Sequence, residues 1–307
     1  MIEAEVSGRE TMNIRSLVWG MALLTLPIVT LPVHATDKPA WANPFPPYHI
    51  AGNLYYVGGD DLASYLIVTP QGSILLNSNG GNSVPVIKKS VEQLGFKFSD
   101  IKILLISHAH IDHAGGASLV IQETGAKYEV MDRDVEVIES GGKTDYTYAD
   151  VESEYYPPVK VDRVLRDGDT VELGGTVLTA HLTPGHTKGD TTWTFDENEG
   201  GKLLHVAIIG SISGNPGMKL VNNARYPEIA DDFERSFSVL KSLPCDIYLG
   251  AHGSYFGMTN KYKRWDAGDK NAFIDPDGYK AYVAQRQQAF EKQLQTQKEA
   301  FMDAGRP

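Results

Sequence analysis

The sequence predicts an α/β (α+β) fold, in which two β-sheets carry helices on their outer faces within one domain. Three observations support this fold class. Short β-rich runs separated by turn residues recur along the chain, and helical patterns follow strands in both halves. Hairpins dominate between those helices, which favours two sheets. No linker or shift in composition divides residues 36–307.

Each element is predicted from the spacing of its apolar residues. In residues 82–95, Val84, Ile87 and Val91 share one helical face. Residues 101–107, "IKILLIS", are continuously apolar, which indicates a buried strand. The C-terminal segment is amphipathic but polar, so we expect a solvated helix packed along one edge. The predicted strands are 54–58, 63–69, 73–77, 101–107, 126–132, 161–165, 176–183, 191–196, 203–209 and 245–250, and the predicted helices are 82–95, 226–243 and 278–301.

Composition excludes some classes of function. The formal net charge of −11 argues against a nucleic-acid backbone as the main partner, because phosphate binding requires a basic patch. A small anionic substrate at a locally positive metal site remains compatible with this charge. Cys245 is the only cysteine, so the chain can form no intrachain disulfide and no thiolate cluster. Any metal must be held by histidine and carboxylate side chains.

Residues 1–35 are predicted to comprise upstream residues and an export signal peptide. From Met12 the chain has one basic residue, Arg15, and then an apolar stretch. That stretch ends in Val33-His34-Ala35, a small-x-small cleavage pattern. Residues 1–11 are acidic, unlike the start of a signal peptide. The sequence therefore leaves open whether translation starts at Met1 or at Met12.

A membrane anchor is the alternative interpretation of this segment. Pro27 and Pro32 interrupt the apolar run, which is short for a membrane-spanning helix. We therefore expect a periplasmic protein without stable membrane association, with one domain over residues 36–307. Sequence does not reveal the oligomeric state, and a monomer is the default expectation.

The segment "ISHAHIDHAGG" at residues 106–116 concentrates possible metal ligands. His108 and His110 follow a predicted strand, and their imidazoles share one side of an extended chain because side chains alternate with period two. Asp112 and His113 follow in a turn, and the small residues after them let the backbone turn tightly. This density of ligands is typical of a metal site.

Four donors are more than one catalytic zinc ion needs and fewer than two metal ions need. Such a zinc takes three protein ligands, and two metals about 3.5–4 Å apart need more than four. His186 in "LTPGHTKGD" and His252 in "YLGAHGSY" each follow a predicted strand and have small neighbours. The sequence therefore offers six ligands, enough for two metal ions. His34, His49, His181 and His205 are interpreted as histidines without a metal role.

His-x-His-x-Asp-His, a later Pro-Gly-His-Thr and a final Gly-x-His together resemble the metallo-β-lactamase superfamily, over about residues 48–260. The resemblance implies an αββα sandwich, the metallo-β-lactamase fold. Many reactions occur on this fold, so other details must decide the function. Residues 205–217, "HVAIIGSISGNPG", contain neither the metal-bridging Asp of the thioesterases, lactonases and nucleases nor the Cys of the first lactamase subclass. The segment resembles the third subclass of zinc β-lactamases.

This resemblance implies a zinc-dependent hydrolase that opens the β-lactam ring of penicillins, cephalosporins and carbapenems with a metal-bound hydroxide. Two Zn²⁺ per chain and a small-molecule β-lactam substrate follow from it. The implied ligands are His108, His110 and His186 for the first zinc and Asp112, His113 and His252 for the second.

Further roles are expected beside the metal ligands. By resemblance, Asp112 also orients the hydroxide and relays a proton. Ser211 and Ser213 match positions that bind the substrate carboxylate in the third subclass, although turn chemistry alone also explains them. The aromatic-rich loop at residues 144–160 is expected to wall the substrate cleft through Tyr146, Tyr148, Tyr155 and Tyr156. The alternative is that they only pack on the rim of the domain.

Two positions depart from the family pattern. Asn77 stands where the superfamily commonly has Asp, so a charge that would tune the ligands is lost. Asp190 stands where relatives more often have a small residue; it lies near the zinc and offsets that loss, or it is an exposed loop carboxylate. The rival functions are a metal-dependent lactonase or thioesterase on the same fold, and a non-catalytic periplasmic zinc-binding protein.

Overall fold

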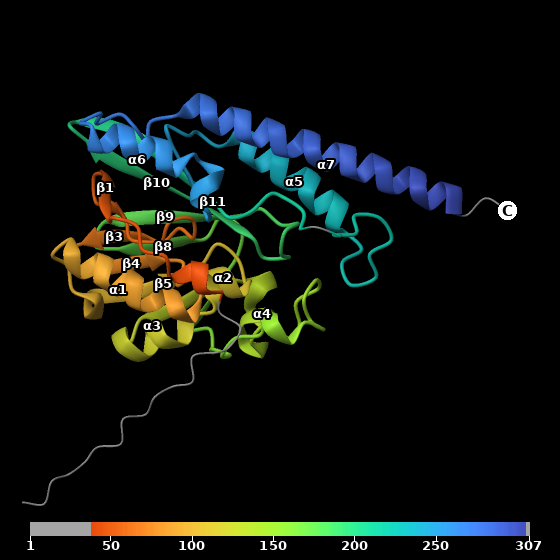
Figure 1. Ribbon diagram of the computed structural model, residues 1–307, viewed down its shortest axis with the longest axis horizontal. Coiled ribbons are helices and arrows are strands. Elements are labelled where there is room, and N and C mark those ends of the chain that lie inside the picture. Colours follow the sequence, from red (N-terminus) through yellow and green to blue (C-terminus); the bar gives the residue numbers. More distant parts are fainter. Residues whose placement is uncertain (1–37, 216, 305–307) are drawn as a thin grey trace, which may run out of the picture. The chain divides into compact units, whose positions relative to one another are not determined.

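The structure, a computed structural model, describes residues 38–215 and 217–304. The predicted signal peptide lies outside these residues. Two β-sheets form the centre and helices cover their outer faces, as Figure 1 shows. The predicted α/β sandwich is therefore confirmed. No helix within the described part of the chain has the length and apolar character to cross a membrane.

The first sheet has seven strands in the order β1-β2-β3-β4-β5-β6-β7. β1 to β4 pair antiparallel, and β4 to β7 pair parallel. Parallel neighbours need a crossover segment, and helices supply it between β4 and β5, β5 and β6, and β6 and β7. The strands are β1 (Tyr48–Ala51), β2 (Leu54–Tyr56), β3 (Tyr65–Thr69), β4 (Gly72–Leu76), β5 (Ile101–Leu105), β6 (Lys127–Met131) and β7 (Arg163–Leu165).

The second sheet has five strands in the order β12-β11-β10-β9-β8. β8 to β11 pair antiparallel, and β12 joins β11 in parallel after a helical crossover. The strands are β8 (Thr170–Leu173), β9 (Thr176–Leu182), β10 (Thr191–Glu199), β11 (Lys202–Ile209) and β12 (Ile247–Gly250).

The helices lie on the two outer faces of the sandwich. In Figure 1, α1 and α3 cover the first sheet, and α5, α6 and α7 cover the second. α7 is polar along most of its length and buries one stripe of apolar residues, which agrees with the predicted helix packed along one edge. The α-helices are α1 (Val84–Gln93), α2 (Ile111–Ala114), α3 (Ala117–Thr124), α4 (Val135–Ser140), α5 (Ile229–Ser242), α6 (Met258–Asp266) and α7 (Pro276–Ala304).

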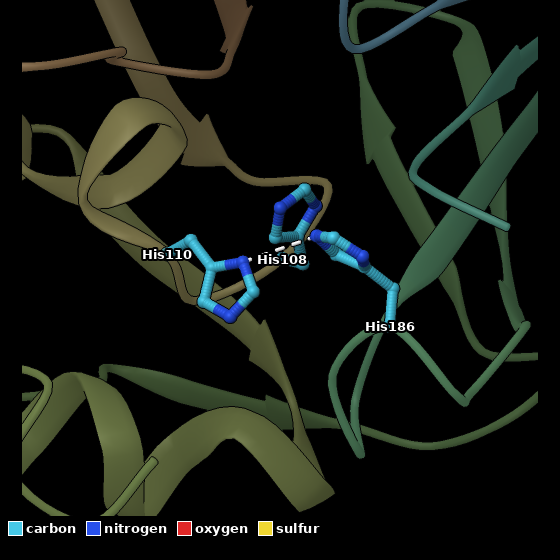
Figure 2. A group of neighbouring side chains, drawn as sticks. All are labelled: His108, His110 and His186. Atoms are coloured by element: carbon cyan, nitrogen blue, oxygen red, sulfur yellow. Dashed lines mark hydrogen bonds between the residues drawn. The ribbon is translucent and has the colours of Figure 1, made fainter. Parts of the chain in front are cut away.

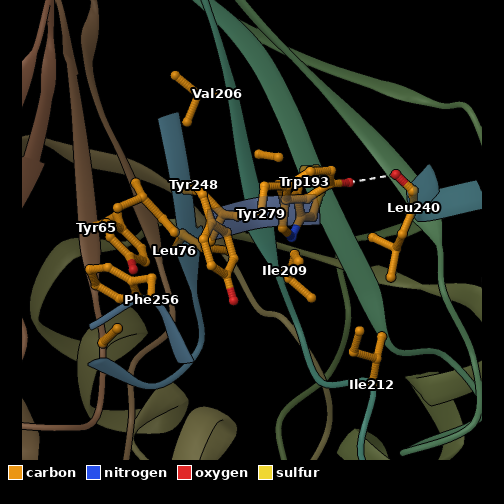
Figure 3. Packing of buried hydrophobic residues seen from close by; sticks show 14 of the residues in the cluster. Tyr65, Leu76, Trp193, Val206, Ile209, Ile212, Leu240, Tyr248, Phe256 and Tyr279 are labelled. Atoms are coloured by element: carbon orange, nitrogen blue, oxygen red, sulfur yellow. Dashed lines mark hydrogen bonds between the residues drawn. The ribbon is translucent and has the colours of Figure 1, made fainter. Parts of the chain in front are cut away.

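Two apolar cores follow from the alternation of side chains along the strands. In β4, Ile74 and Leu76 point into the core between the sheets, whereas Leu75 points into the core beneath α1 and α3. Figure 3 shows part of the larger core, in which Trp193 of β10 lies near the middle. The Trp193 indole N–H donates to the carbonyl of Ile106 at 2.9 Å, so the second sheet holds the segment that leaves β5.

Most predicted elements agree with the observed ones to within a few residues at each end. β1, β8, α2, α3, α4 and α6 were not predicted. Among these, α3 begins directly after Gly115 and Gly116, where the sequence suggested only a tight turn. Its backbone N–H groups at Leu119 and Val120 bond to the Gly116 carbonyl, so the helix starts from the turn itself.

Glu197 of β10 is buried against the β1–β2 hairpin, and its exposed fraction is only 5%. Its Oε2 accepts the Asn53 backbone N–H at 3.2 Å, and a Cβ at Gly52 would overlap the same carboxylate. Burial raises the pKa of Glu197 from 4.5 to about 7. The folded protein therefore binds this proton more tightly than the unfolded chain does.

The contribution of protonated Glu197 to stability should be present below about pH 4.5 and lost as the pH rises through about 7. Glu197→Gln imitates the protonated side chain. We expect this variant to match the unmodified protein near pH 5 and to unfold at a higher urea concentration at pH 8, both measured in chelator. Glu172→Gln, at an exposed position of β8, is the control. A constant difference between Glu197→Gln and the unmodified protein across this range would contradict the prediction.

Candidate metal centre

The loops at one end of the two sheets bring six potential metal donors together. Four come from the segment after β5, and one each comes from the loops after β9 and β12. The first sheet therefore supplies four donors and the second sheet supplies two. Along the chain they are His108, His110, Asp112, His113, His186 and His252.

The short helix α2 sets the spacing within the first loop. His110 is its extended N-cap residue, with φ −82° and ψ 154°. The N–H groups of His113 and Ala114 donate to the His110 carbonyl at 3.0 and 2.9 Å, so the chain reverses immediately after the His-x-His pair. Gly116 is required beneath this turn, since a Cβ there would lie 2.8 Å from the Ser78 carbonyl oxygen.

His108, His110 and His186 form the first group of donors, and Figure 2 shows their rings turned toward one another. His110 Nδ1 lies 3.1 Å from His186 Nε2. The His108 ring is nearly perpendicular to both, with centroid distances of 4.9 and 4.7 Å. All three side chains are buried, and one donor atom from each lies within 4.8 Å of the others. These are the three residues predicted for the first metal.

The second group of predicted donors lies beside the first. His113 Nε2 lies 3.2 Å from His252 Nε2. Asp112 Oδ2 lies 3.5 Å from His113 Nε2 and 3.6 Å from His252 Nε2. Asp112 and His113 also group with His108, because one donor atom from each lies within 4.8 Å of the others. The structure thus brings all six predicted donors together.

Four of the five imidazoles have a carboxylate or carbonyl oxygen within 3.6 Å of the ring nitrogen that points away from the centre, and those of His186 and His252 are hydrogen-bonded to it. A proton held on that outer nitrogen leaves the inner nitrogen with a free lone pair, which is the form a metal binds. Pairs of inner nitrogens about 3 Å apart, with no other acceptor between them, fit a shared metal ion. The outer contacts are His108 Nδ1 to Asp190 Oδ2 at 3.3 Å, His110 Nε2 to Asp145 Oδ2 at 3.6 Å, His186 Nδ1 to the Ser213 carbonyl at 2.8 Å, and His252 Nδ1 to Asp61 Oδ2 at 2.9 Å.

Burial keeps three of the imidazoles neutral. It lowers the pKa of His108 well below the usual value, that of His113 to about 4 and that of His186 to about 3. Burial alone would raise the pKa of Asp112, but the neighbouring histidines outweigh it and lower that pKa to about 2. Neutral imidazoles with one charged carboxylate are a set of ligands that zinc accepts.

His110 and His252 shift in the opposite direction. Burial lowers the pKa of each ring, but Asp145 beside His110 and Asp61 beside His252 outweigh burial and raise it. These carboxylates stabilise a proton on the outer nitrogen that they face.

Asp134 fastens the two loops that carry the first group. One carboxylate oxygen accepts the Ala109 N–H and the Thr187 hydroxyl, each at 2.9 Å, and the other accepts the Gly189 N–H at 2.8 Å. Ala109 lies between two of the donors, and Thr187 and Gly189 follow His186. Burial raises the pKa of Asp134 to about 6. One buried carboxylate therefore fixes the distance between loops from different sheets.

Similarity to known proteins agrees with this geometry. The profile described as the metallo-β-lactamase superfamily matches residues 57–252. The chain belongs to the metallo-β-lactamase superfamily. The native FEZ-1 metallo-β-lactamase from Legionella gormanii is 58% identical with a TM-score of 0.83, over 84% of this chain and 98% of that one.

Two further relatives differ in how closely they match. LRA-12, a class B3 di-zinc metallo-β-lactamase from an Alaskan soil metagenome, is 37% identical with a TM-score of 0.79, over 83% of this chain and 97% of that one. This agrees with the predicted resemblance to the third subclass. A hydroxyacylglutathione hydrolase of Rhodopseudomonas palustris is 26% identical over 66% of each chain. The chain thus spans just under two thirds of the length of that curated relative.

The two predicted serines lie near the donors, Ser211 through Tyr255 and Ser213 through His186. Ser211 is fully buried, and its Oγ lies 3.2 Å from the Tyr255 hydroxyl. Ser213 is half-buried and its side chain lies near the Tyr255 hydroxyl, while its carbonyl accepts the His186 Nδ1 proton. Tyr255 in turn lies against the His252 ring, with centroids 4.9 Å apart. Three hydroxyl groups therefore gather at this edge of the site.

The tyrosines of the 144–160 loop take different positions. Tyr156 is buried, and its hydroxyl donates to the Ala109 carbonyl at 2.7 Å, so it supports the histidine loop from within the protein. Tyr155 is half-buried and donates to the Ala149 carbonyl. Tyr148 packs against a donor ring, with its ring centroid 5.1 Å from that of His110.

The two departures from the family pattern have separate environments. Asn77 accepts the Ser107 N–H at 2.8 Å and donates to the Ala63 carbonyl, and it contacts none of the six donors. Its φ of 67° is one that asparagine tolerates better than most residues. Asp190 has an exposed fraction of 0%, so it is not an exposed loop carboxylate.

Several residues of the site were not predicted. No spacing in the sequence marks them, because each acts through a contact with a distant segment. For the aspartates, the only signal in the sequence was a carboxylate near a strand end, and many residues in this chain share that feature. These residues are Asp61, Asp134, Asp145 and Tyr255.

Asp134→Asn should destabilise the protein and loosen both loops. An asparagine has one acceptor oxygen, so its NH2 group must face either Gly189 N–H or Ala109 N–H. Leaving a buried donor unpaired costs about 1–3 kcal/mol. We expect a loss of that size in the free energy of unfolding, measured by urea denaturation in chelator. Thr187→Val, which removes a single hydroxyl donor, should cost less than Asp134→Asn; a larger cost would contradict the role given to Asp134.

Proposed function

We propose that this member of the metallo-β-lactamase superfamily is a zinc-dependent hydrolase that opens the β-lactam ring of penicillins, cephalosporins and carbapenems. The observation that carries the proposal is the convergence of five imidazoles and Asp112 at one end of the sandwich, without a cysteine or a second aspartate among the donors. The 58% identity over 98% of FEZ-1 supports a β-lactam substrate.

We assign two zinc ions to the six donors. His108, His110 and His186 would hold the first, and their inner nitrogens already face one another. The second would be held by the adjoining group, and a related structure is described as di-zinc. The ligands of this second ion would be Asp112, His113 and His252.

Bound zinc would lower the pKa of a water molecule and polarise the lactam carbonyl. The chain must then orient the attacking oxygen and move its proton. Asp112 is suited to both tasks, because its side chain keeps 24% of its surface exposed beside His113 and His252. Its carboxylate would accept the proton of the nucleophile and pass it to the departing amine nitrogen.

The hydroxyl groups of Ser211, Ser213 and Tyr255 would recognise the carboxylate that β-lactam antibiotics carry. Hydroxyls donate to a carboxylate without adding charge to an already acidic chain. Ser211 would act through Tyr255, since its own oxygen is buried. Tyr148 and Tyr155 would line the side of the substrate site opposite these hydroxyl groups. Tyr156 would support the loop that carries His108 and His110.

The cellular setting is part of the same proposal. A leader that ends near Ala35 would deliver the protein to the periplasm, where β-lactams act. The remaining residues, 36–307, would form a single domain and function as a monomer. Resistance to β-lactam antibiotics is the expected phenotype.

The decisive experiment is hydrolysis of a carbapenem and a penicillin by the purified protein, with and without chelator. We expect turnover that chelator abolishes and added Zn²⁺ restores. Activity that survives complete zinc removal would refute the metal mechanism. If the zinc-loaded protein does not hydrolyse any β-lactam, lactones and thioesters become the substrates to test, as the similarity to hydroxyacylglutathione hydrolases suggests. One buried zinc per chain without any turnover would favour a non-catalytic zinc-binding protein.

Tyr148→Ala should raise KM several-fold and change kcat less than about twofold, since the ring supplies contact area rather than chemistry. Steady-state kinetics on one carbapenem measures both parameters. Tyr155→Ala, in the same loop but farther from the donors, is the matched comparison and should show a smaller effect. Equal parameters for Tyr148→Ala and the unmodified protein would remove Tyr148 from the substrate site.

A further inference from the structure

The carboxylate of Asp190 lies where the ends of three strands meet. Asp190 directly precedes β10, and its side chain reaches the residues that follow β5, β9 and β11. It is fully buried, so bulk solvent does not reach it. Its hydrogen-bond partners in the structure come from the protein.

Three groups supply those contacts. The Ser211 N–H donates to Oδ2 at 2.9 Å and also approaches Oδ1 at 3.1 Å. The Thr183 hydroxyl donates to Oδ1 at 3.3 Å. His108 Nδ1 lies 3.3 Å from Oδ2. Asp190 therefore contacts His108, a proposed metal ligand, and also Ser211, one of the three residues whose hydroxyl groups gather at the edge of the site.

The surroundings are fitted to this carboxylate. A Cβ at Gly210 would lie 2.3 Å from Asp190 Oδ1, so the chain after β11 leaves room for it only because residue 210 is glycine. Asn77 does not compete for His108, because its amide is used by Ser107 and Ala63. Apart from Asp190, the neighbour of His108 Nδ1 is the Ser107 hydroxyl at 3.3 Å.

We propose that Asp190 is a positioning residue that holds His108 as an Nδ1-protonated ligand of the first metal and fixes Ser211 through its backbone. The proposal rests on the metal site proposed above. A carboxylate can only accept, so it selects the imidazole tautomer that carries the proton at Nδ1. The Nε2 lone pair of His108 then faces the other donors. Asp190 thus supplies, from the second sheet, an oxygen beside His108 that Asn77 does not supply.

Asp190→Asn separates this role from simple packing because the two side chains have nearly the same shape. The asparagine must present its NH2 group either to Ser211 N–H or to His108 Nδ1. In the first case the Ser211 N–H keeps the oxygen at the Oδ2 position but also faces the NH2 group, and the neutral amide oxygen is a weaker acceptor for His108 than a carboxylate. In the second case His108 must take the other tautomer, with a proton on the nitrogen that should bind the metal. Either outcome weakens the site without removing a ligand.

The test is the zinc affinity of the purified protein, measured by competition with a chromophoric chelator. Loss of an outer partner of a metal-bound histidine typically weakens metal binding about 10–100-fold, and we expect Asp190→Asn to fall in that range. Asp232→Asn is the matched control, since Asp232 is also buried and hydrogen-bonded but contacts only Arg133 and Tyr226. It should bind zinc within about twofold of the unmodified protein.

Nitrogen chemical shifts of ¹⁵N-labelled histidine give a second readout that packing alone would not change. In the zinc-loaded protein His108 should be protonated at Nδ1, and Asp190→Asn should remove or shift that signal. Unchanged affinity and an unchanged His108 signal would overturn the proposal. If Asp190→Asn does not fold, Asp190→Ser replaces it, because the serine oxygen can still accept the Ser211 N–H. Weakened zinc binding in a protein that hydrolyses no β-lactam would refute the proposed substrate and leave this inference standing.

Discussion

The site depends on one requirement: each converging imidazole must direct a lone pair toward the same small volume. Nitrogens about 3 Å apart with their lone pairs facing each other repel when nothing lies between them, so the rings would turn away if they were free. Acceptors on the outer nitrogens prevent this, and Asp61, Asp145, Asp190 and the Ser213 carbonyl supply them. The strand ends, the glycines and Asp134 serve to hold those acceptors in place.

The sequence was sufficient to predict the parts of the fold and site that depend on local spacing. The apolar run 101–107 predicted a buried strand, and the His-x-His pair after it predicted two imidazoles on one side. His186 and His252 were found because each follows a strand and has small neighbours. α3 was missed because it has no polar N-cap residue and begins directly after a glycine. β8 was missed because its four residues show only a short alternation of polar and apolar side chains.

Apart from Asp190, the residues that orient the ligands were beyond local reasoning. Asp61 hydrogen-bonds His252, which lies 191 residues later in the chain. Asp134 hydrogen-bonds Ala109, Thr187 and Gly189, which lie 25, 53 and 55 residues away from it. Such contacts arise from the order of strands in two sheets, which no spacing along the chain encodes. Tyr156 illustrates the same limit, because an aromatic residue in a loop gives no sign of whether it faces the cleft or the interior.

The division of donors between the sheets has a thermodynamic consequence. Four donors follow β5 in the first sheet, and two follow strands of the second. An ion bound by both sets acts as a cross-link between the halves of the sandwich, and an unfolded chain offers no such arrangement. The free energy of metal binding is then added to that of folding, so the population of folded protein depends on the free zinc around it. Scarcity of zinc would reduce the amount of intact protein as well as its activity.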